Sequence, residues 1–268
     1  MHGIQYFYNM ILSSASALPY KPCRIVSLVP SQTELLYHLN LDEVTIGITK
    51  FCVHPQIWFK TKQRVGGTKT LNIQKIKSLQ PDLIIANKEE NIKEQIEELA
   101  KDFPVWISDV TTLENAYSMM NAIGKLTGRE EKAETIVTRI KTNFSQLQTS
   151  NHKPQTAYLI WKEPYMTVGR DTFIHAILSQ AGFDNIFQNK TRYPEVTVED
   201  LLIAGCQLLL LSSEPYPFKQ KHIDELQQQL PQTKIILADG EMFSWYGSRL
   251  LQAPAYFKTL QSELASIL

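Results

Sequence analysis

Short apolar runs alternate with amphipathic segments along the first part of the chain. The runs at 24–29, 44–49, 82–87 and 103–108 have the length of buried strands. Segments 72–80 and 91–102, which lie among them, have the character of helices. Because strand and helix alternate, the pattern predicts an α/β fold with a parallel sheet.

The first apolar run stops at Pro30, and a helical pattern follows directly. Ser31 precedes Glu34 by three residues, which is the spacing of a capping box. In a parallel sheet such a turn lies at the carboxyl edge of the strands, where ligands bind and where the exposed amides of a helix start favour polar or anionic groups. For Ser31 and Glu34, capping alone is the alternative role.

After Thr112 the pattern becomes helical over 113–128 and 129–150. The second segment contains neither Pro nor Gly, and Ile136, Ile140 and Phe144 recur every four residues. It predicts a helix on the order of 30 Å long. Its remaining positions are largely charged, which indicates a helix lying on the surface.

Beyond this helix the first pattern returns, with strands predicted at 156–164, 207–218 and 234–243 and a helix at 171–182. Segments 71–87 and 196–212 correspond at one constant offset, which pairs Asn72 with Thr197, Ile76 with Leu201 and Asp82 with Gln207.

This internal similarity predicts two parallel-sheet α/β lobes joined by a single long backbone helix. The expected divisions are a lead-in over 1–23, an N-terminal lobe over 24–128, the connecting helix over 129–150 and a C-terminal lobe over 151–268. We expect a small ligand in a cleft between the lobes.

The composition and charge of the chain argue against several classes of partner and site. Lys plus Arg number 27, and Asp plus Glu also number 27. The chain therefore lacks the excess of positive charge that would indicate a nucleic-acid partner. Cys23, Cys52 and Cys206 have no paired spacing typical of a zinc knuckle or a disulfide framework. The longest apolar run is too short to span a bilayer. We expect no membrane span and no intrinsic cofactor.

The segment 6–19 has two interpretations. It is apolar and contains an Ala-x-Ala pattern at Ala15 and Ala17, as a cleaved secretory signal does. A signal also has a basic start, and the first lysine is Lys21, after the cleavage point. The alternative is an edge strand or hairpin that leads into the first core strand.

Six segments in order carry a resemblance: "RIVSLVPSQTELL", "GG…LNIQKIKSLQPDLIIA", the long helix, "GFDNIF", "RYPEVTVEDLL" and "FSWYGSR". From about Arg24 onward the chain resembles the helical-backbone (type III) periplasmic binding proteins. These are ABC-importer receptors for vitamin B12, haem and iron siderophores, and the vitamin B12-binding branch is the most similar. The resemblance implies rigid lobes and a monomer that binds a corrinoid such as cobalamin, haem or a ferric siderophore, with cobalamin first among them, for an ABC permease.

The stretch "DGEMFSWYGSRL", 239–250, packs acids, an arginine and aromatics together without regular periodicity. We interpret it as a loop lining the ligand cleft. Aromatic rings give large contact area at little conformational cost, although they can instead seal the contact between lobes. The loops expected at the carboxyl edges supply the candidate ligand-binding residues Pro30, Ser31, Phe51, Cys52, His54, Trp161, Pro164, Tyr165, Glu214, Tyr216, Glu241, Met242, Phe243, Trp245, Tyr246 and Arg249.

The chain departs from the vitamin B12-binding pattern at three places. Relatives dock onto permease arginines through a glutamate on each lobe, and the matching positions are Gln74 and Glu199. A neutral Gln74 cannot form the charge-assisted pair. Two family tryptophans align with Thr68 and Met242. The ligand and the permease partner therefore stay open.

The sequence leaves two other classes of function open. Cys52 and His54 are close enough to share a metal, but a zinc site needs three or four ligands and no second cluster follows. His54 remains a possible axial ligand to a metal already held by a macrocycle. A chelatase-like enzyme and a cytoplasmic carrier of haem or another metal chelate are the alternatives. The expected location is the periplasm or envelope by resemblance, and the cytoplasm if no signal precedes the domain.

Overall fold

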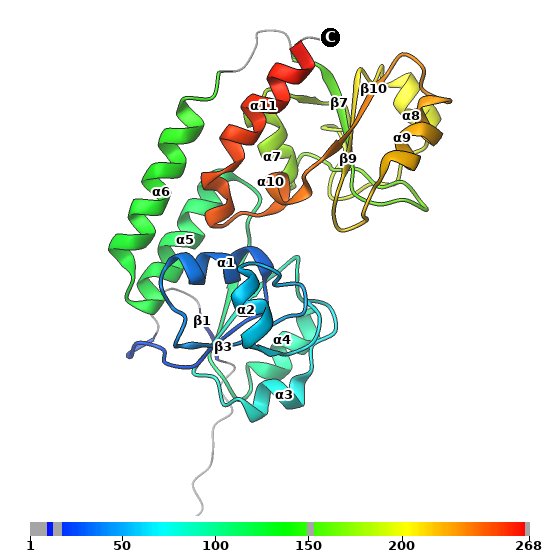
Figure 1. Ribbon diagram of the computed structural model, residues 1–268. Coiled ribbons are helices and arrows are strands. Elements are labelled where there is room, and N and C mark those ends of the chain that lie inside the picture. Colours follow the sequence, from blue (N-terminus) through cyan, green and yellow to red (C-terminus); the bar gives the residue numbers. More distant parts are fainter. Residues whose placement is uncertain (1–9, 13–17, 149–152, 266–268) are drawn as a thin grey trace, which may run out of the picture. The chain divides into compact units, whose positions relative to one another are not determined.

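The computed structural model describes residues 10–12, 18–148 and 153–265. The chain forms two compact units, which are drawn together in Figure 1. Unit 1 holds the chain up to Val110 together with Asn115–Thr138 and Tyr246–Ser248. Unit 2 holds Thr111–Glu114, Arg139–Trp245 and the chain from Arg249 onward.

Unit 1 is built on a six-stranded parallel sheet in the order β1-β6-β5-β2-β3-β4. Its strands are β1 (Ile11–Leu12), β2 (Ile25–Ser27), β3 (Thr45–Ile48), β4 (Gln63–Arg64), β5 (Leu83–Asn87) and β6 (Val105–Ser108). The helices along this part of the chain are α1 (Pro30–His38), α2 (Gln56–Thr61), α3 (Ile73–Ser78), α4 (Lys93–Leu99) and α5 (Leu113–Thr127). The four predicted strands and the parallel sheet are confirmed.

The central strands of this sheet read as continuous apolar runs because both of their faces are covered. All five residues of β5 are buried. Val26, Ile84 and Val105, on three adjacent strands, pack in one core with Ile76 of α3 and Ile96 of α4. These helices therefore cover the sheet with the apolar faces that their spacing predicted.

Residues 11–12 form the edge strand β1, which pairs in parallel with Val105 and Trp106 of β6. Main-chain bonds on either side extend this pairing, since Met10 N donates to Ala100 O and Val105 N donates to Met10 O. The edge-strand interpretation of the lead-in is thus confirmed at these residues. The cleavage pattern around Ala15 lies outside the described residues.

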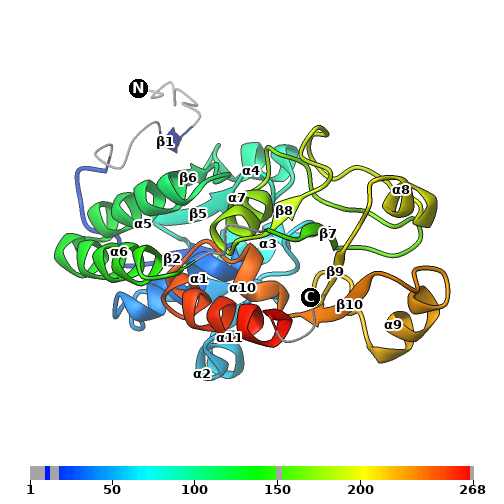
Figure 2. The same ribbon diagram turned by 90° about the horizontal axis from the view of Figure 1, so that it is seen from above.

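Unit 2 contains a four-stranded parallel sheet in the order β10-β9-β7-β8. Its strands are β7 (Gln155–Leu159), β8 (Asp184–Asn185), β9 (Leu208–Ser212) and β10 (Lys234–Ala238). The helices along this part of the chain are α7 (Phe173–Gln180), α8 (Val198–Ile203), α9 (Gln220–Gln227), α10 (Gly240–Ser244) and α11 (Ala253–Ala265), with a 3-10 turn at Ser248–Leu251. Figure 2 shows the same elements from above.

The predicted internal repeat is present in the structure. Asn72 caps α3 by accepting from Lys75 N, and Thr197 caps α8 by accepting from Asp200 N. Farther along each half, Asp82 accepts from the main chain at Cys23 and Arg24, just before β2. Its counterpart is the Gln207 side chain, which accepts from Gln155 N at the start of β7. The two halves therefore repeat in side-chain roles as well as in chain pattern.

Two predicted boundaries need correction. The long helix, α6, runs from Glu130 to Ser145 and so ends five residues before the expected boundary at residue 150. Its residues up to Thr138 group with unit 1 and the rest with unit 2. Helix α1 begins at Pro30, with Val29 as a cap that makes no side-chain bond. Proline at the first helical position presets the backbone, so Ser31 lies inside the helix and the capping box was wrong.

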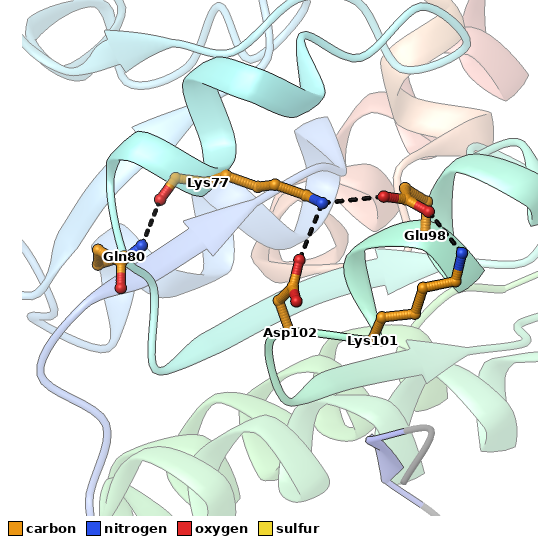
Figure 3. A network of polar contacts seen from close by, with 5 residues as sticks. All are labelled: Lys77, Gln80, Glu98, Lys101 and Asp102. Atoms are coloured by element: carbon orange, nitrogen blue, oxygen red, sulfur yellow. Dashed lines mark hydrogen bonds and ion pairs between the residues drawn. The ribbon is translucent and has the colours of Figure 1, made fainter. Parts of the chain in front are cut away.

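Helices α3 and α4 are joined by a polar network, shown in Figure 3. Lys77 Nζ lies 2.9 Å from Glu98 Oε1 and 2.8 Å from Asp102 Oδ2. Lys101 Nζ contacts the other Glu98 oxygen at 2.7 Å. The hydrogen bonds from Lys101 and then Lys77 lower the pKa of Glu98 to about 2. The network fixes α3 and, with it, the exposed position of Gln74 at the start of that helix.

Among the described residues, no helix has the length and apolar character needed to cross a membrane. Sequence reasoning missed α2, α9, α10, α11 and the two short strands β4 and β8. Helices α2 and α10 have six and five residues, too few to establish a hydrophobic period.

Candidate functional site

The strands of each unit run parallel, so their carboxyl ends meet at one edge of each sheet, where ligands bind in open α/β folds. In unit 1 the loops after β2 and β3 carry Pro30, Ser31, Phe51, Cys52 and His54. Phe51 presents its ring to solvent with half of its surface exposed, and Lys50 Nζ lies 5.1 Å from the ring centroid. Pro30 and His54 are partly exposed, whereas Ser31 is buried.

Cys52 faces the interior of unit 1. Its thiol lies 3.1 Å from Thr33 Oγ1 and 3.2 Å from Thr49 Oγ1, and the side chain is fully buried. Burial raises the pKa of the Cys52 thiol, which therefore stays neutral. A metal site shared with His54 needs a thiolate, and the described residues include no cluster of three or more metal-binding side chains. Cys52 therefore acts as a packing residue.

A buried amide network organises the same edge of unit 1. The side chain of Asn87, at the end of β5, accepts from the main chain at Glu89 and Glu90 and donates to Ser108. Asn91 accepts from Asn87 N and donates to Thr68 O at 3.1 Å. These bonds hold the ends of β5 and β6 together with the turn around Thr68. The signal in the sequence was an asparagine ending an otherwise apolar strand.

Residues Tyr246–Ser248 group with unit 1. Ser248 Oγ lies 2.8 Å from Nδ1 of His38, near the end of α1. Gly247 permits close approach, because a Cβ there would lie only 2.4 Å from the Ser31 carbonyl oxygen. Tyr246 is buried in the structure.

In unit 2 the loop after β7 turns tightly between Trp161 and Met166, which form an isolated bridge. Glu163 in this turn has a φ of 68°, a left-handed conformation that is uncommon for a non-glycine residue. Pro164 is exposed, and burial raises the pKa of the partly exposed Tyr165. The turn leaves Trp161 with 41% of its surface exposed.

Trp161 contacts the loop that follows β9. Its ring meets that of Tyr216 edge to face, with centroids 5.7 Å apart. Tyr216 in turn contacts Phe218, whose ring is buried. The two loops thus form one aromatic surface, defined by Trp161 and Tyr216, at the carboxyl edge of unit 2.

Glu214 lies two residues before Tyr216 and connects this loop to α10. Its Oε1 accepts from Ser244 Oγ at 2.7 Å and from Trp245 Nε1 at 2.9 Å. Burial raises the pKa of the Glu214 carboxyl group, and the two hydrogen bonds act against this effect. Glu214 therefore orients the Trp245 indole.

The segment 239–250 is more regular than expected. Asp239 caps α10 by accepting from Glu241 N, and a 3-10 turn begins at Ser248. Arg249 Nη2 lies 3.2 Å from Glu241 Oε2, and the guanidinium carbon is 5.2 Å from the Trp245 ring centroid. Glu241 and Arg249 therefore form an ion pair within this segment. Met242 on α10 is partly exposed.

Phe243 does not share the position of its neighbours. Its side chain is fully buried and its ring lies 5.0 Å from that of Tyr158 and 4.9 Å from that of Phe257. On a helix, consecutive residues point in different directions. Phe243 therefore anchors α10 in the core of unit 2 and is not placed to contact a ligand at the surface.

A shallow depression of about 580 Å³ lies beside Glu214. It is lined by Ser213, Glu214, Leu237, Ala238, Asp239, Glu241 and Tyr256. Tyr256 accepts from Asp239 N at 2.9 Å, so α11 supports the turn into α10. Sequence reasoning included Glu214 and Glu241 but missed Ser244, Asp239 as a cap, and His222, which contacts Tyr216.

Two repeated α/β units with aromatic loops at the carboxyl edges of parallel sheets define a solute-binding protein. The family model described as "Periplasmic binding protein" matches residues 25–235, and the chain belongs to this family. The family is one of binding proteins rather than enzymes, which removes the chelatase-like alternative.

The chain is similar to proteins named as vitamin B12-binding proteins. The chain is 26% identical over 265 residues to the vitamin B12-binding protein of Pectobacterium atrosepticum, covering 95% of this chain and 93% of that protein. The solved periplasmic vitamin B12-binding protein of Vibrio cholerae superposes with a TM-score of 0.75 at 23% identity, covering 91% and 99% of the two chains.

The fold is also similar to the periplasmic haem-binding protein of Roseiflexus sp. RS-1, with a TM-score of 0.77 at 20% identity, covering 88% and 98% of the two chains. These likenesses establish the two-lobed fold, and they include binders of two different macrocycles.

Proposed function

We propose that this protein is the monomeric substrate-binding component of an ABC importer and binds a corrinoid, most simply cobalamin. The observation that carries the proposal is the exposed Trp161 ring set against Tyr216 at the carboxyl edge of unit 2. Such a surface suits a flat, largely apolar macrocycle, because aromatic side chains bury large areas at low entropic cost. The named vitamin B12-binding relatives support the choice of a corrinoid.

We propose candidate ligand contacts on the carboxyl-edge loops of each unit taken by itself. In unit 1 they are Pro30, Phe51 and His54. In unit 2, Trp161, Pro164, Tyr165 and Tyr216 form the aromatic side and Glu241 and Met242 the polar side, which the buried Trp245 and Arg249 order from within the unit. Glu214 orients Trp245, and Ser31, Cys52, Phe243 and Tyr246 support the loops from buried positions.

A tryptophan-fluorescence titration with cyanocobalamin, cobinamide, haemin and a ferric siderophore tests the ligand class. Saturable quenching by a corrinoid at micromolar or lower concentration is expected. Trp161→Ala should weaken cyanocobalamin binding by about 30-fold, since an aromatic anchor contributes about 2 kcal/mol. The matched control is Leu202→Ala, which also truncates an exposed apolar side chain but lies on α8, away from the loop that carries Trp161. Equal affinity of Trp161→Ala and the control in calorimetry would remove Trp161 from the site.

Haem is the second candidate ligand. His54 is a partly exposed imidazole three residues after the half-exposed Phe51, and an imidazole can supply an axial ligand to haem iron. Preferred binding of haemin, with a change in its visible absorption spectrum that His54→Ala abolishes, would favour this candidate over the corrinoid.

For the importer, we propose that Glu199 docks onto a basic residue of a permease. Glu199 is the second residue of α8 and Gln74 the second residue of α3, and both are exposed. An exposed carboxylate can form a charge-assisted hydrogen bond with arginine, whereas the amide of Gln74 makes a neutral one. Glu199→Gln should therefore reduce ligand uptake more than Gln74→Ala does, and Gln74→Glu should increase it.

We propose a periplasmic or envelope location, which the description of the family and the names of the solved periplasmic relatives support. Cell fractionation with detection of the native protein tests this. Recovery in the cytosolic fraction together with tight ligand binding would indicate the alternative, a cytoplasmic carrier.

A further inference from the structure

Helix α9 contacts both loops that form the aromatic surface of unit 2. From its second turn, Glu225 Oε2 lies 2.6 Å from Nζ of Lys162, the residue after Trp161. From its first turn, His222 Nε2 lies 3.5 Å from the Tyr216 hydroxyl oxygen. One helix that no sequence pattern had indicated therefore contacts the side chain next to Trp161 and the side chain of Tyr216.

The hydrogen bonds of His222 define its tautomer. Its Nδ1 accepts from Lys219 N at 2.9 Å and so completes the first turn of α9. A neutral imidazole carries one proton and accepts only at the other nitrogen. The proton must therefore reside on Nε2, which faces the Tyr216 hydroxyl. That hydroxyl oxygen then accepts from His222, and its own proton is left to donate to another group.

The surroundings of His222 favour this neutral form. The ring is buried between Tyr216 and Phe218, with centroids 5.6 Å and 5.4 Å away. Burial is the main cause that lowers the pKa of His222, followed by Lys162 and Lys221. Glu225 acts in the opposite direction and Lys219 in the same direction.

We propose that His222 is a positioning residue for ligand binding: its Nε2–H holds the Tyr216 hydroxyl as a hydrogen-bond donor toward a carbonyl, carboxylate or phosphate oxygen of the ligand, next to the Trp161 ring. This inference rests on the proposed function. Protonation of His222 removes the acceptor at Nδ1, because an imidazolium donates from both nitrogens. The new Nδ1–H then opposes the Lys219 N–H, so the ring leaves the cap and carries its Nε2–H away from the Tyr216 hydroxyl.

The pKa of His222 is lower in the folded protein than its ordinary value of 6.5. As pH falls below about 6.5, His222 therefore takes up its proton in the unfolded chain before it does so in the folded protein. The contribution of neutral His222 to the free energy of unfolding is complete above that pH and is lost as pH falls through the folded pKa. Ligand affinity should be constant at neutral pH and decline in acid as the ring becomes protonated.

A ligand-free measurement tests the geometry. Nuclear magnetic resonance of the imidazole, assigned by its loss in His222→Gln, should show an Nε2–H tautomer that titrates below pH 6.5. An Nδ1–H tautomer, or titration above that pH, would overturn the proposal whether or not any ligand binds.

Calorimetry with cyanocobalamin from pH 7.5 to pH 5 tests the role in binding. The wild-type affinity should fall toward the acid end of this range, by at most about tenfold, the effect of one lost hydrogen bond. His222→Gln should have a flat profile, because glutamine at this helix position keeps a cap acceptor and does not titrate. His222→Phe and Tyr216→Phe should bind roughly three- to tenfold more weakly at pH 7.5.

His175→Gln is the control, since burial also lowers the pKa of His175 but this ring lies on α7 and contacts Asn185. Its pH profile should match that of the wild type. Full pH dependence in His222→Gln, or wild-type affinity in His222→Phe, would refute the positioning role. If the wild type does not bind cyanocobalamin, the proposed function fails, and the resonance experiment alone decides the geometry of His222.

Discussion

Replacing Glu214 by alanine tests how the site of unit 2 is held together. The carboxylate is the common acceptor for Ser244 Oγ and Trp245 Nε1, at 2.7 Å and 2.9 Å. Alanine removes both bonds without adding bulk. We expect the indole of Trp245 to lose its orientation, so Glu214→Ala should reduce stability and ligand affinity together.

The magnitude follows from the exposure of the two donors. A buried donor left without a partner costs about 1 to 3 kcal/mol, and Trp245 is buried. Ser244 is partly exposed, so its hydroxyl can bond to water and adds little. Burial of the Glu214 carboxylate is itself unfavourable, so its removal offsets part of the loss in the free energy of unfolding. The net loss in the free energy of unfolding should be about 1 to 2 kcal/mol.

Glu214→Gln is the matched control, because glutamine keeps an acceptor and carries no charge. Burial raises the pKa of Glu214 above its ordinary value of 4.5. A raised carboxyl pKa means that the contribution to stability is complete below about pH 4.5 and declines as pH rises through the folded pKa. At pH 7 the glutamine variant should therefore be at least as stable as the wild type.

Urea denaturation at pH 7 and pH 4.5, followed by far-ultraviolet circular dichroism, measures these differences. The order expected at pH 7 is glutamine variant, wild type, alanine variant, with the first two closer together at pH 4.5. Equal stability of the alanine and glutamine variants at pH 7 would show that the two hydrogen bonds do not anchor Trp245.

Three further perturbations test the scaffold. Phe243→Ala should cost about 3 to 5 kcal/mol in urea denaturation, because it opens a cavity beside Tyr158 and Phe257. Glu98→Gln should lower the urea midpoint at pH 7 but not at pH 2, because the stabilisation from a pKa of about 2 is lost as pH falls from 4.5. Gly240→Ala should lower the melting temperature, since its Cβ would lie 2.6 Å from Glu214 Cγ and Ser212 Oγ.

The fold was largely predictable from sequence because its signals are local. A buried parallel strand appears as an unbroken apolar run, and β5 and β9 are both of this kind. The repeat could be checked by offset alone, and the capping roles of Asn72 and Thr197 confirm it. The predicted capping box at Ser31 was wrong because α1 begins at Pro30, one residue earlier.

The site was harder to predict because exposure within a short segment depends on tertiary packing. Phe243 and Trp161 are both aromatic residues near strand ends, yet the first is in the core and the second is exposed. The difference arises from α10, a helix of five residues whose cap, Asp239, resembles any turn residue. His222 was missed because its role depends on a backbone amide and a tyrosine brought together by folding.

The two halves repeat their scaffold but differ at the carboxyl edge. Asp82 and Gln207 both accept from the main chain around the start of a strand, so a carboxylate and an amide serve the same structural purpose. At the strand ends the equivalent residues diverge: Asn87 organises an amide network, whereas Ser212 accepts from Tyr158 and donates to the Glu214 carbonyl. The first kind of contact therefore recurs in both halves, whereas the second differs between them. Ligand selectivity should therefore reside in the divergent edge, and exchanging edge residues should alter the preferred ligand with less effect on stability than exchanging scaffold residues.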